Sequence, residues 1–405
     1  MLTYTYTARD SATGQKVKAE VQAESEQAAA RLIQKEGLAP LEIKAKEIEG
    51  AGFKKYFNKV KTKDRVIFAR QLSTLINAGL PLVQSLRTVL SQTKSKPLQT
   101  VINSVIVDVE SGKPMSEAIS KFPNVFNQVF VSLVASGETS GTLDTALDRI
   151  ASQQEKDAEI MAKVRGAMVY PLIVLFVMAG VVGFMITSVL PQVETLYAGI
   201  PGVQLPLITR VLLSISHFIT RYWYIVIVLL IVAGFATSKW ARTLGGKTVI
   251  DGLKMKLWPV GPLFMKLYMA RFARTGTTLV STGVPLIQTL EITAKAVDNV
   301  HISKSIEQAI EKVKGGKSLS SALTGDENFL ELVPQMLKIG EDSGAIEQML
   351  GKTADYYEKE VDNQIKAIST IIEPVLMIVL GIVALIIVGA VLLPIYGLVG
   401  KSVIK

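Results

Sequence analysis

The feature that most constrains this chain is a repeat. The segment FARQLSTLINAGLPLVQSL at residues 68–86 returns as FARTGTTLVSTGVPLIQTL at residues 272–290, and ten of the nineteen positions are identical. Two copies are too few for a solenoid, in which many repeats stack along one continuous core. The sequence therefore predicts one domain that has been duplicated.

The repeated unit also contains a corner motif and a long apolar run. Gly-Glu-Thr-Ser-Gly at residues 137–141 returns as Gly-Glu-Asp-Ser-Gly at residues 340–344. Each apolar run has a proline at both ends, Pro171 and Pro191 for the first, Pro374 and Pro394 for the second. Each copy thus combines polar helical chain with a segment long enough to cross a membrane.

The composition indicates a membrane protein with large polar parts, because 49% of the residues are hydrophobic and the mean hydropathy is +0.35. The chain has no cysteine, which excludes disulfides, thiolate metal sites and cysteine nucleophiles. With only His217 and His301 to supply imidazole, a histidine-based metal site or catalytic triad is not expected. No cofactor is predicted.

Residues 1–50 are expected to form a small α+β module. Residues 3–8 and 16–23 alternate in polarity as strands do, residues 24–36 have a helical pattern that ends at a glycine, and residues 41–43 indicate a last short strand. The start of the chain lacks the apolar core of a signal peptide, so membrane insertion is expected to depend on internal segments.

A basic linker follows at residues 51–65, where six lysines and arginines alternate with aromatic and aliphatic residues in a chain of net charge +9. Each basic residue contributes roughly 1 kcal/mol at an anionic membrane surface, so the linker is a candidate for contact with membrane lipid. The alternative is a solvated linker. Nucleic acid is not expected as a partner, because no recognised binding motif surrounds these residues.

Two helical bundles are expected, at residues 66–168 and 269–370. Helical periodicity in the first is interrupted by turn residues at 79–81, 112–114 and 123–124. Several short antiparallel helices follow from this spacing. The fold class is therefore a mainly α membrane protein with two homologous bundles and the small N-terminal module.

Three membrane-spanning helices are predicted at residues 169–191, 221–238 and 373–394. Residues 171–190 carry no charge, and at 1.5 Å per residue a stretch of this length covers about 30 Å, the thickness of the hydrocarbon core. The second run is shorter, but tyrosine and tryptophan residues stand at both of its ends, as at membrane interfaces.

The distribution of lysine and arginine predicts the orientation. Basic residues are frequent before the first span and after the second, and sparse in the loop between these spans, at residues 192–220. Both bundles, the linker at residues 239–268 and the N-terminus are therefore expected in the cytoplasm. The loop and the tail at residues 395–405 are expected outside it, in a multi-pass protein of the inner membrane.

The corner motifs have a structural and a functional interpretation. In the structural interpretation, the leading glycine closes one helix, and Ser140 or Thr142 in the first copy and Ser343 in the second cap the long helix that follows. The glutamate lies near the positive end of that long helix. In the functional interpretation, the motifs are a docking or ion-binding point for a basic partner. The candidate residues are Gly137, Glu138, Ser140, Gly141, Gly340, Glu341, Ser343 and Gly344.

Arg70 and Arg274 occupy equivalent places in the two copies, beside an apolar helix face. Each is expected to pair with a carboxylate of its own bundle, and Glu138 and Glu341 are the candidates. The alternative is a contact with a partner protein.

Five residues of the membrane segments are singled out. Pro171 and Pro374 are expected in the first turn of membrane helices. Ala179 and Gly183 offer a small face on which another helix could pack closely. Glu373 stands at the mouth of the third span, either as an end residue that reaches toward water or as a helix contact.

Two tripeptides imitate the end of a phosphate-binding loop, at residues 246–248 and 316–318. The complete loop requires a further glycine five positions before its second one, where this chain has Ala241 and Glu311. We expect no nucleotide hydrolysis by this chain, and no enzymatic activity.

The combination of features resembles the PilC/GspF family, the inner-membrane platform proteins of type IV pili and type II secretion systems, and is most like those of pili. The resemblance is carried by the two Phe-Ala-Arg…Gly-x-Pro-Leu segments, the two corners, Tyr170-Pro171, Glu373-Pro374 and residues 205–209. It covers nearly the whole chain, and its specificity comes from the duplication combined with the order of three spans.

The resemblance implies a non-enzymatic scaffold that forms a homo-oligomer and couples a cytoplasmic assembly ATPase to insertion of pilins into a filament. It also implies contacts with pilins or pseudopilins and with other inner-membrane assembly proteins. The alternatives are the equivalent platform of a type II secretion system and a small membrane transporter. Transporters normally carry polar or discontinuous helices near the membrane midplane, and these spans have almost none.

Overall fold

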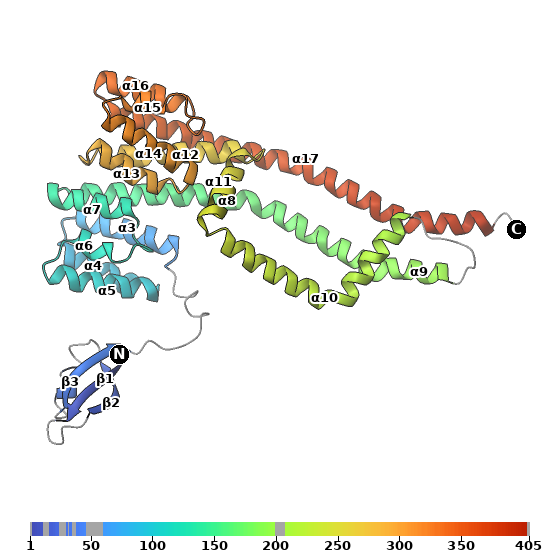
Figure 1. The fold of residues 1–405 in the computed structure, drawn as a ribbon, viewed down its shortest axis with the longest axis horizontal. Coiled ribbons are helices and arrows are strands. Elements are labelled where there is room, and N and C mark those ends of the chain that lie inside the picture. The colour runs from blue at the N-terminus through green and yellow to red at the C-terminus, as the bar shows by residue number, and fades with distance from the viewer. Residues whose placement is uncertain are drawn as a thin grey trace. The chain divides into compact units, whose positions relative to one another are not determined.

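The fold is mainly α-helical, as predicted, and the chain divides into two compact units, Met1–Lys59 and Val60–Lys405 (Figure 1). The computed structural model describes residues 2–10, 16–23, 30, 32–34, 38–45, 60–198 and 207–402.

The N-terminal unit contains an antiparallel sheet of three strands. The strands are β1 (Leu2–Asp10), β2 (Lys16–Ala23) and β3 (Leu38–Ala45), in the order β2-β1-β3. Tyr6 and Ile33 are buried in its small core. The last strand is longer than predicted because it pairs with β1 along nearly all of its length.

Two predictions fall largely on residues that the structure does not describe. In the expected helix at 24–36, Ala30 and residues 32–34 are helical, and the others lie outside the described residues. Residues 51–59 of the basic linker lie outside them as well, so its contact with lipid stays a prediction.

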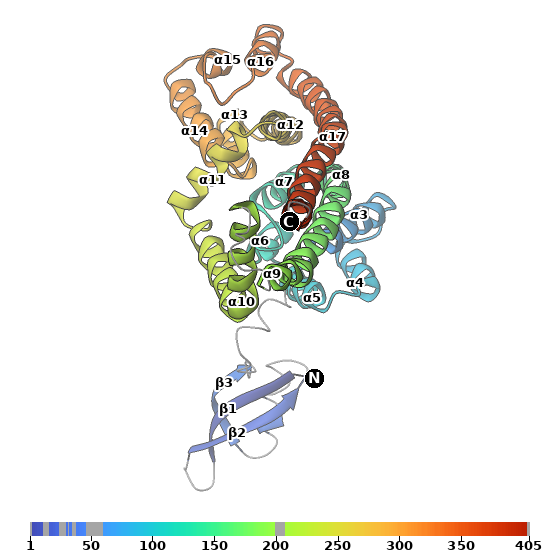
Figure 2. The ribbon, with the colours of Figure 1, turned by 90° about the vertical axis from the view of Figure 1, so that its right-hand side faces the viewer.

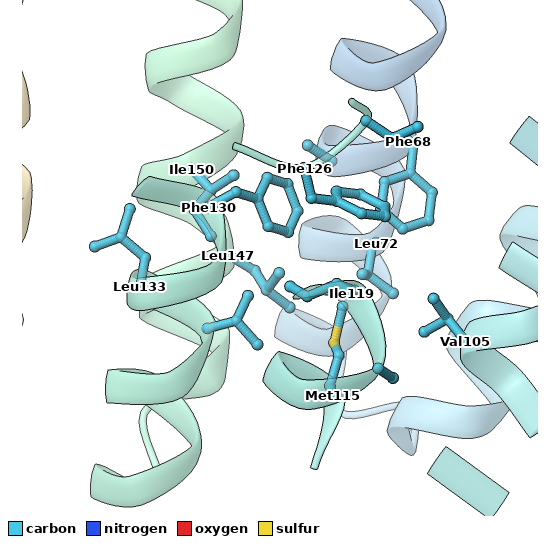
Figure 3. Packing of buried hydrophobic residues seen from close by; sticks show 14 of the residues in the cluster. Phe68, Leu72, Val105, Met115, Ile119, Phe126, Phe130, Leu133, Leu147 and Ile150 are labelled. Atoms are coloured by element: carbon cyan, nitrogen blue, oxygen red, sulfur yellow. The ribbon is translucent and has the colours of Figure 1, made fainter. Parts of the chain in front are cut away.

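The first bundle combines five short helices with the beginning of a long one. Buried side chains from all six form its core, and Figure 3 shows Phe68, Phe126 and Phe130 together in it. Gly79 and Gly112 have positive φ, and α4 and α6 each start after a proline, which is the turn chemistry predicted from the sequence. The helices are α3 (Thr62–Asn77), α4 (Leu82–Gln92), α5 (Lys96–Glu110), α6 (Met115–Ser120), α7 (Gln128–Ser140) and α8 (Leu143–Phe184).

The second bundle repeats this order of helices. Its members are α12 (Gly261–Val280), α13 (Leu286–Ala296), α14 (Val300–Lys314), α15 (Leu319–Leu323), α16 (Leu332–Ser343) and α17 (Ile346–Ser402). The segment predicted as a linker at residues 239–268 is instead largely helical. It forms α11 (Leu244–Lys256) and the first turns of α12, and α11 packs on α12 and α14. The sequence did not reveal this packing because the anchoring side of α11 contains polar residues such as Asp251.

Among the described residues, three helices are long and apolar enough to cross a membrane, as predicted, and they lie in Leu143–Gln192, Thr220–Trp240 and Ile346–Leu392. The first and third are continuous with the bundles (Figure 1). The sequence predicts Pro171 and Pro374 in the first turn of membrane helices, but both lie inside these continuous helices. That prediction was wrong because a proline removes one backbone donor, and the remaining hydrogen bonds of a long helix maintain it.

The described part of the expected loop at residues 192–220 is helical. The chain leaves α8 through a π-helical segment (Met185–Val189) and α9 (Leu190–Ala198). It then enters α10 (Leu207–Trp240), whose dihedral angles are non-helical at Tyr222. The second span is therefore the latter part of a longer, kinked helix.

The ends of the apolar helices that lie far from the bundles are held together by polar and apolar contacts. Ser216 Oγ donates to the carbonyl of Ile186 at 2.7 Å, and Thr209 Oγ1 donates to that of Ala390 at 3.1 Å. Leu213 is buried beside Ala390. The three apolar helices are thus joined at this end, while two of them continue into the bundles at the other.

Candidate functional site: two bundle corners and the helices that leave them

Both corner motifs turn the chain through a left-handed glycine. Gly141 ends α7 with φ of 73°, and Gly344 ends α16 with φ of 68°. The sequence predicts this closing role for Gly137 and Gly340, and that prediction was wrong, because both lie one turn earlier inside the helices. Glycine is needed there for close packing instead: a Cβ on Gly137 would lie 2.7 Å from Ala146 Cβ, and one on Gly340 would lie 2.9 Å from a backbone atom of α17.

The serines of the corners do not cap the long helices. Ser140 Oγ donates to the carbonyl of Ser136 at 2.8 Å, and Ser343 Oγ donates to that of Ile339 at 2.6 Å. Thr142, the alternative predicted for the first copy, is the N-cap residue of α8, but its side chain makes no capping bond. The predicted caps were wrong because each serine is still helical and bonds back to its own preceding turn.

The glutamates of the corners cap a different helix from the one predicted. Glu138 accepts from the backbone N–H groups of Met115 at 2.5 Å and Ser116 at 3.1 Å, and from Ser116 Oγ at 2.5 Å. Its carboxylate therefore lies at the N-terminus of α6, where four backbone donors lack helical partners.

Glu341 repeats this arrangement at the N-terminus of α15. It accepts from the N–H groups of Leu319 at 2.6 Å and Ser320 at 3.2 Å, and from Ser320 Oγ. A sequence signal for this role existed, because Gly-Lys-Pro-Met-Ser at residues 112–116 returns as Gly-Lys-Ser-Leu-Ser at residues 316–320. The second of these segments, which imitates a phosphate loop, is thus the turn before α15.

The corner carboxylates are therefore used inside the bundles. Both oxygens of each glutamate accept hydrogen bonds from the same bundle. These contacts support the structural interpretation of the corners. A docking role would require a partner to compete with three internal donors.

Arg70 and Arg274 also pair inside their bundles, but not with the predicted glutamates. Arg70 Nε donates to Glu155 Oε1 at 2.7 Å, and its Nη1 donates to Asp148 Oδ1 at 2.8 Å. The prediction of Glu138 was wrong because α3 runs along α8 and not along the corner end of α7. The hydrogen bond to Glu155 raises the pKa of Arg70, so the guanidinium stays charged.

In the second bundle, Arg274 Nε donates to Glu358 Oε1 at 2.7 Å, and a second nitrogen pairs with Asp355. Glu358 is the counterpart of Glu155, so this contact is conserved between the two copies. Burial lowers the pKa of Arg274, but the bonds to the two carboxylates outweigh burial and the pKa is raised. Glu341 was therefore not the partner of Arg274.

A polar seam joins the two bundles. Lys156 of α8 lies 3.0 Å from Glu358 of α17, and Lys163 lies 2.7 Å from Asp362. Figure 2 shows α8 and α17 side by side along this seam. Because Glu358 also binds Arg274, one carboxylate links both bundles.

The seam has an apolar part as well. Leu279, Val284 and Ile292 of the second bundle are buried in the core cluster of the first. Ser136 Oγ of α7 donates to the carbonyl of Thr282 at 2.6 Å. Sequence reasoning missed this interface, because no local pattern reports which bundle face lies against another.

Further toward the apolar segments, α8 and α17 enclose a groove. Their shared polar-to-apolar boundary is packed by Ile160 and Val361. Beyond it, a groove of about 300 Å³ lies between the two helices. It is lined by Ile173, Val174, Val177, Met178, Val181, Val182, Leu380, Val383, Ala384 and Ile387.

The other candidate residues of the membrane segments differ in burial. Ala179 is exposed, and among the described residues no atom lies within 4 Å of a Cβ placed on Gly183. The predicted close packing on this face is thus not made within the part of the chain that the structure describes. Glu373 and Pro374 are exposed, whereas Pro171 is buried.

Comparison with family models accounts for the duplication. The model of the type II secretion system protein F matches residues 68–191 and again residues 272–394, and the model of that protein's N-terminal domain matches residues 1–44. The chain belongs to the type II secretion system protein F family. The family domain occurs twice here, each time as a bundle followed by its apolar run.

Relatives in this family cover nearly the whole chain. The type IV pilus assembly protein PilC of Thermus thermophilus is 38% identical over 99% of this chain and 99% of its own. The type IV pilus assembly protein TapC of Aeromonas hydrophila is 34% identical over 95% and 93%, respectively. The type II secretion system protein F of Pseudomonas aeruginosa is 31% identical over 98% and 99%.

The resemblance inferred from the sequence is thereby confirmed. This member of the protein F family is a platform protein of a type IV pilus or a type II secretion system, and a protein of the inner membrane.

Proposed function

We propose that this protein is the platform of a type IV pilus machine and couples a cytoplasmic assembly ATPase to insertion of pilins into the filament. The observation that carries the proposal is the continuity of α8 and α17. Each begins at a bundle corner and continues without a break into an apolar, membrane-length segment. A displacement of either bundle is therefore transmitted to a membrane helix.

The two ends of these helices suit different partners. The bundles are polar, and we expect them in the cytoplasm, where an ATPase would engage them. The N-terminus is expected on the same side of the membrane, and the C-terminus on the other side. The groove between α8 and α17 has an aliphatic lining, which suits the apolar helix of a pilin or pseudopilin within the bilayer. Neither role requires catalysis or a cofactor from this chain.

Two features favour a pilus over secretion and a scaffold over transport. Identity is 38% to a pilus assembly protein and 31% to a secretion protein of similar coverage, so the secretion platform is the second candidate. The lining of the membrane groove is aliphatic, which disfavours a polar transport path. We also expect the platform to act as a homo-oligomer with other inner-membrane assembly proteins.

A flexible insertion tests the mechanical coupling. In a deletion strain of the native host, the intact gene should restore filaments, whereas a short Gly-Ser insertion after Ala167 in α8 should not, because bundle and span would move independently. The matched control is the same insertion after Lys94, in the exposed turn between α4 and α5. Filaments are counted by electron microscopy, and membrane levels of both variants by immunoblot.

The outcomes separate the candidates. Normal filaments in the α8 variant would contradict mechanical coupling through that helix. Normal filaments in the deletion strain, together with loss of a secreted protein from the medium, would favour the secretion platform.

A further inference from the structure

Helix α11 lies at the level of the membrane surface if the preceding helix crosses the membrane. The second candidate span ends at Trp240, and α11 starts at Leu244. Thr243 caps α11, since its side chain accepts from the N–H of Gly246 at 3.2 Å. Only residues 241–243 lie between the span and α11, so at most about 14 Å of extended chain separates Trp240 from Leu244. The position of this helix relative to the bilayer is therefore set by the span.

One face of α11 is apolar and open. Val249, Leu253 and Leu257 follow one another at four-residue spacing, which places them on the same side, and they are 56%, 57% and 54% exposed. Leu244 and Trp258, at the two ends, are 85% and 73% exposed. Outside the spans, an exposed apolar surface of this kind marks contact with another apolar phase.

Basic residues accompany this face. Lys256 is exposed and follows Leu253 by three residues, which puts it beside the apolar side chains. Arg242 is exposed in the turn that leads from the span. An apolar helix face flanked by lysine, arginine and tryptophan is the composition of helices that lie in the lipid headgroup region.

The opposite face of α11 is held by the second bundle. Asp251 is buried, and its carboxylate accepts from the N–H of Val300 at 3.2 Å. Lys247 pairs with Asp298 at 2.8 Å. These contacts connect α11 to the beginning of α14, so its apolar face is directed away from the bundle.

We propose that α11 lies in the headgroup region of the bilayer and anchors the second bundle to anionic lipid. The apolar side chains would enter the acyl boundary, while Arg242 and Lys256 would meet lipid phosphates. The proposal goes beyond the platform function and depends only on Thr220–Trp240 crossing the membrane. It restricts tilting of the second bundle, because α11 connects that bundle to the surface as well as to α10.

Spin-label accessibility tests this placement directly, because the natural chain has no cysteine. Leu253→Cys is labelled with a nitroxide in the full-length protein, reconstituted into vesicles of phosphatidylethanolamine and phosphatidylglycerol. Leu230→Cys, 64% exposed in the span, is the lipid control, and Ile339→Cys, 53% exposed on α16, is the water control. Collision rates with oxygen and with a water-soluble nickel chelate are compared.

The expected result is a ratio of oxygen to nickel accessibility at Leu253 that is severalfold above that at Ile339 and closer to that at Leu230. A ratio equal to that at Ile339, with Leu230 in lipid, would overturn the proposal. A label at Leu253 that is protected only after addition of cell extract would also overturn it, in favour of a protein partner. Water exposure at Leu230 would instead contradict the span itself.

The electrostatic part has its own test. The double variant Arg242→Glu and Lys256→Glu should move the label at Leu253 toward water in vesicles containing phosphatidylglycerol, and less in vesicles of phosphatidylcholine alone. An equal change in both vesicles would overturn the role of anionic lipid and leave only the apolar contact.

Discussion

The two bundles have the same internal contacts and different neighbours. The carboxylate caps of α6 and α15 and the arginine pairs to Glu155 and Glu358 occur in both copies. In the first bundle, Ser136 lies against the second bundle. Its counterpart in the second bundle is Ile339, which is 53% exposed.

This difference indicates what duplication preserved. Contacts that close a bundle are required in each copy, because an unpaired polar group inside either one would be costly. The surfaces are not under the same constraint, because the interface between the bundles is only partly symmetric: the counterpart helices α8 and α17 pack on each other, whereas α7 of the first copy contacts α12 and α13 of the second. Away from α8 and α17, the contact therefore uses a different face of each copy.

The largest expected effect is at a position where the copies differ in burial. Leu279 is fully buried and belongs to the core cluster of the first bundle, whereas its counterpart Leu75 is partly buried. Leu279→Ala should lower the free energy of unfolding by about 3 kcal/mol, and Leu75→Ala by about half as much, because the cost depends on the cavity left behind. Thermal unfolding in detergent, followed by tryptophan fluorescence, measures both. Equal losses would contradict the shared core.

Alanine substitutions of the corner glycines should lower the free energy of unfolding by similar amounts in the two copies. Gly137→Ala and Gly340→Ala should each destabilise by about 2 kcal/mol, because the added Cβ meets the long helix that follows. The matched control is Gly166→Ala in α8, where no described atom outside the surrounding turns of that helix lies within 4 Å of the added Cβ. That variant should be neutral or slightly stabilising. The same unfolding assay measures these variants. If Gly137→Ala did not destabilise the protein while Gly340→Ala did, the first corner would be less tightly packed than the second.

Substitution of the capping glutamates tests whether the corners have a structural role or a docking role. Glu138→Gln and Glu341→Gln should each cost about 1–2 kcal/mol, because an amide cannot accept on both sides as the carboxylate does. The measurement pairs thermal unfolding with co-purification of the assembly ATPase. Loss of the ATPase with an unchanged unfolding midpoint would support docking at the corners instead.

The smallest expected effect is a response to pH that only the first copy shows. Lys121 and Lys113 hydrogen-bond to Asp108 at 2.6 Å and 3.1 Å and lower the pKa of its carboxyl. In the second copy the corresponding position is Lys312, which donates to the carbonyl of Ala322 at 3.0 Å.

A lowered pKa means that the stabilisation by Asp108 is complete above the pKa of the unfolded chain and is lost as pH falls through the folded value. Acidification should therefore increase hydrogen exchange in residues 113–121, relative to 317–325, after correction for intrinsic rates. Asp108→Asn should abolish the difference. A parallel response of both segments would contradict this assignment.

Local patterns predicted much of this fold. The repeat, the helix breaks at Gly79 and Gly112, and the three apolar runs each depend on a short stretch of chain, where periodicity and turn chemistry are decisive. The corners were located correctly for the same reason. The residue that makes each turn was assigned one helical turn too early, because both glycines of a corner suit a helix end by composition.

The partners of the charged groups required the tertiary structure. Arg70 and Glu155 are 85 residues apart, and Glu138 lies 23 residues from the N–H that it caps. Nothing in the spacing of these residues distinguishes one carboxylate from another. Pro171 is a different case: its local sequence favours a helix start, but the hydrogen bonds of the long helix on both sides of it keep α8 continuous.

Short-range sequence was sufficient for the duplicated bundles, the apolar helices and the family of this protein, since helix periodicity and segment length are properties of neighbouring residues. The seam between the bundles, the caps on α6 and α15 and the open face of α11 were decided by packing. Several faces of a helix are equally plausible contact surfaces when only the sequence is considered. Tertiary packing decides among them, because it determines which groups are buried, which are paired and which stay exposed.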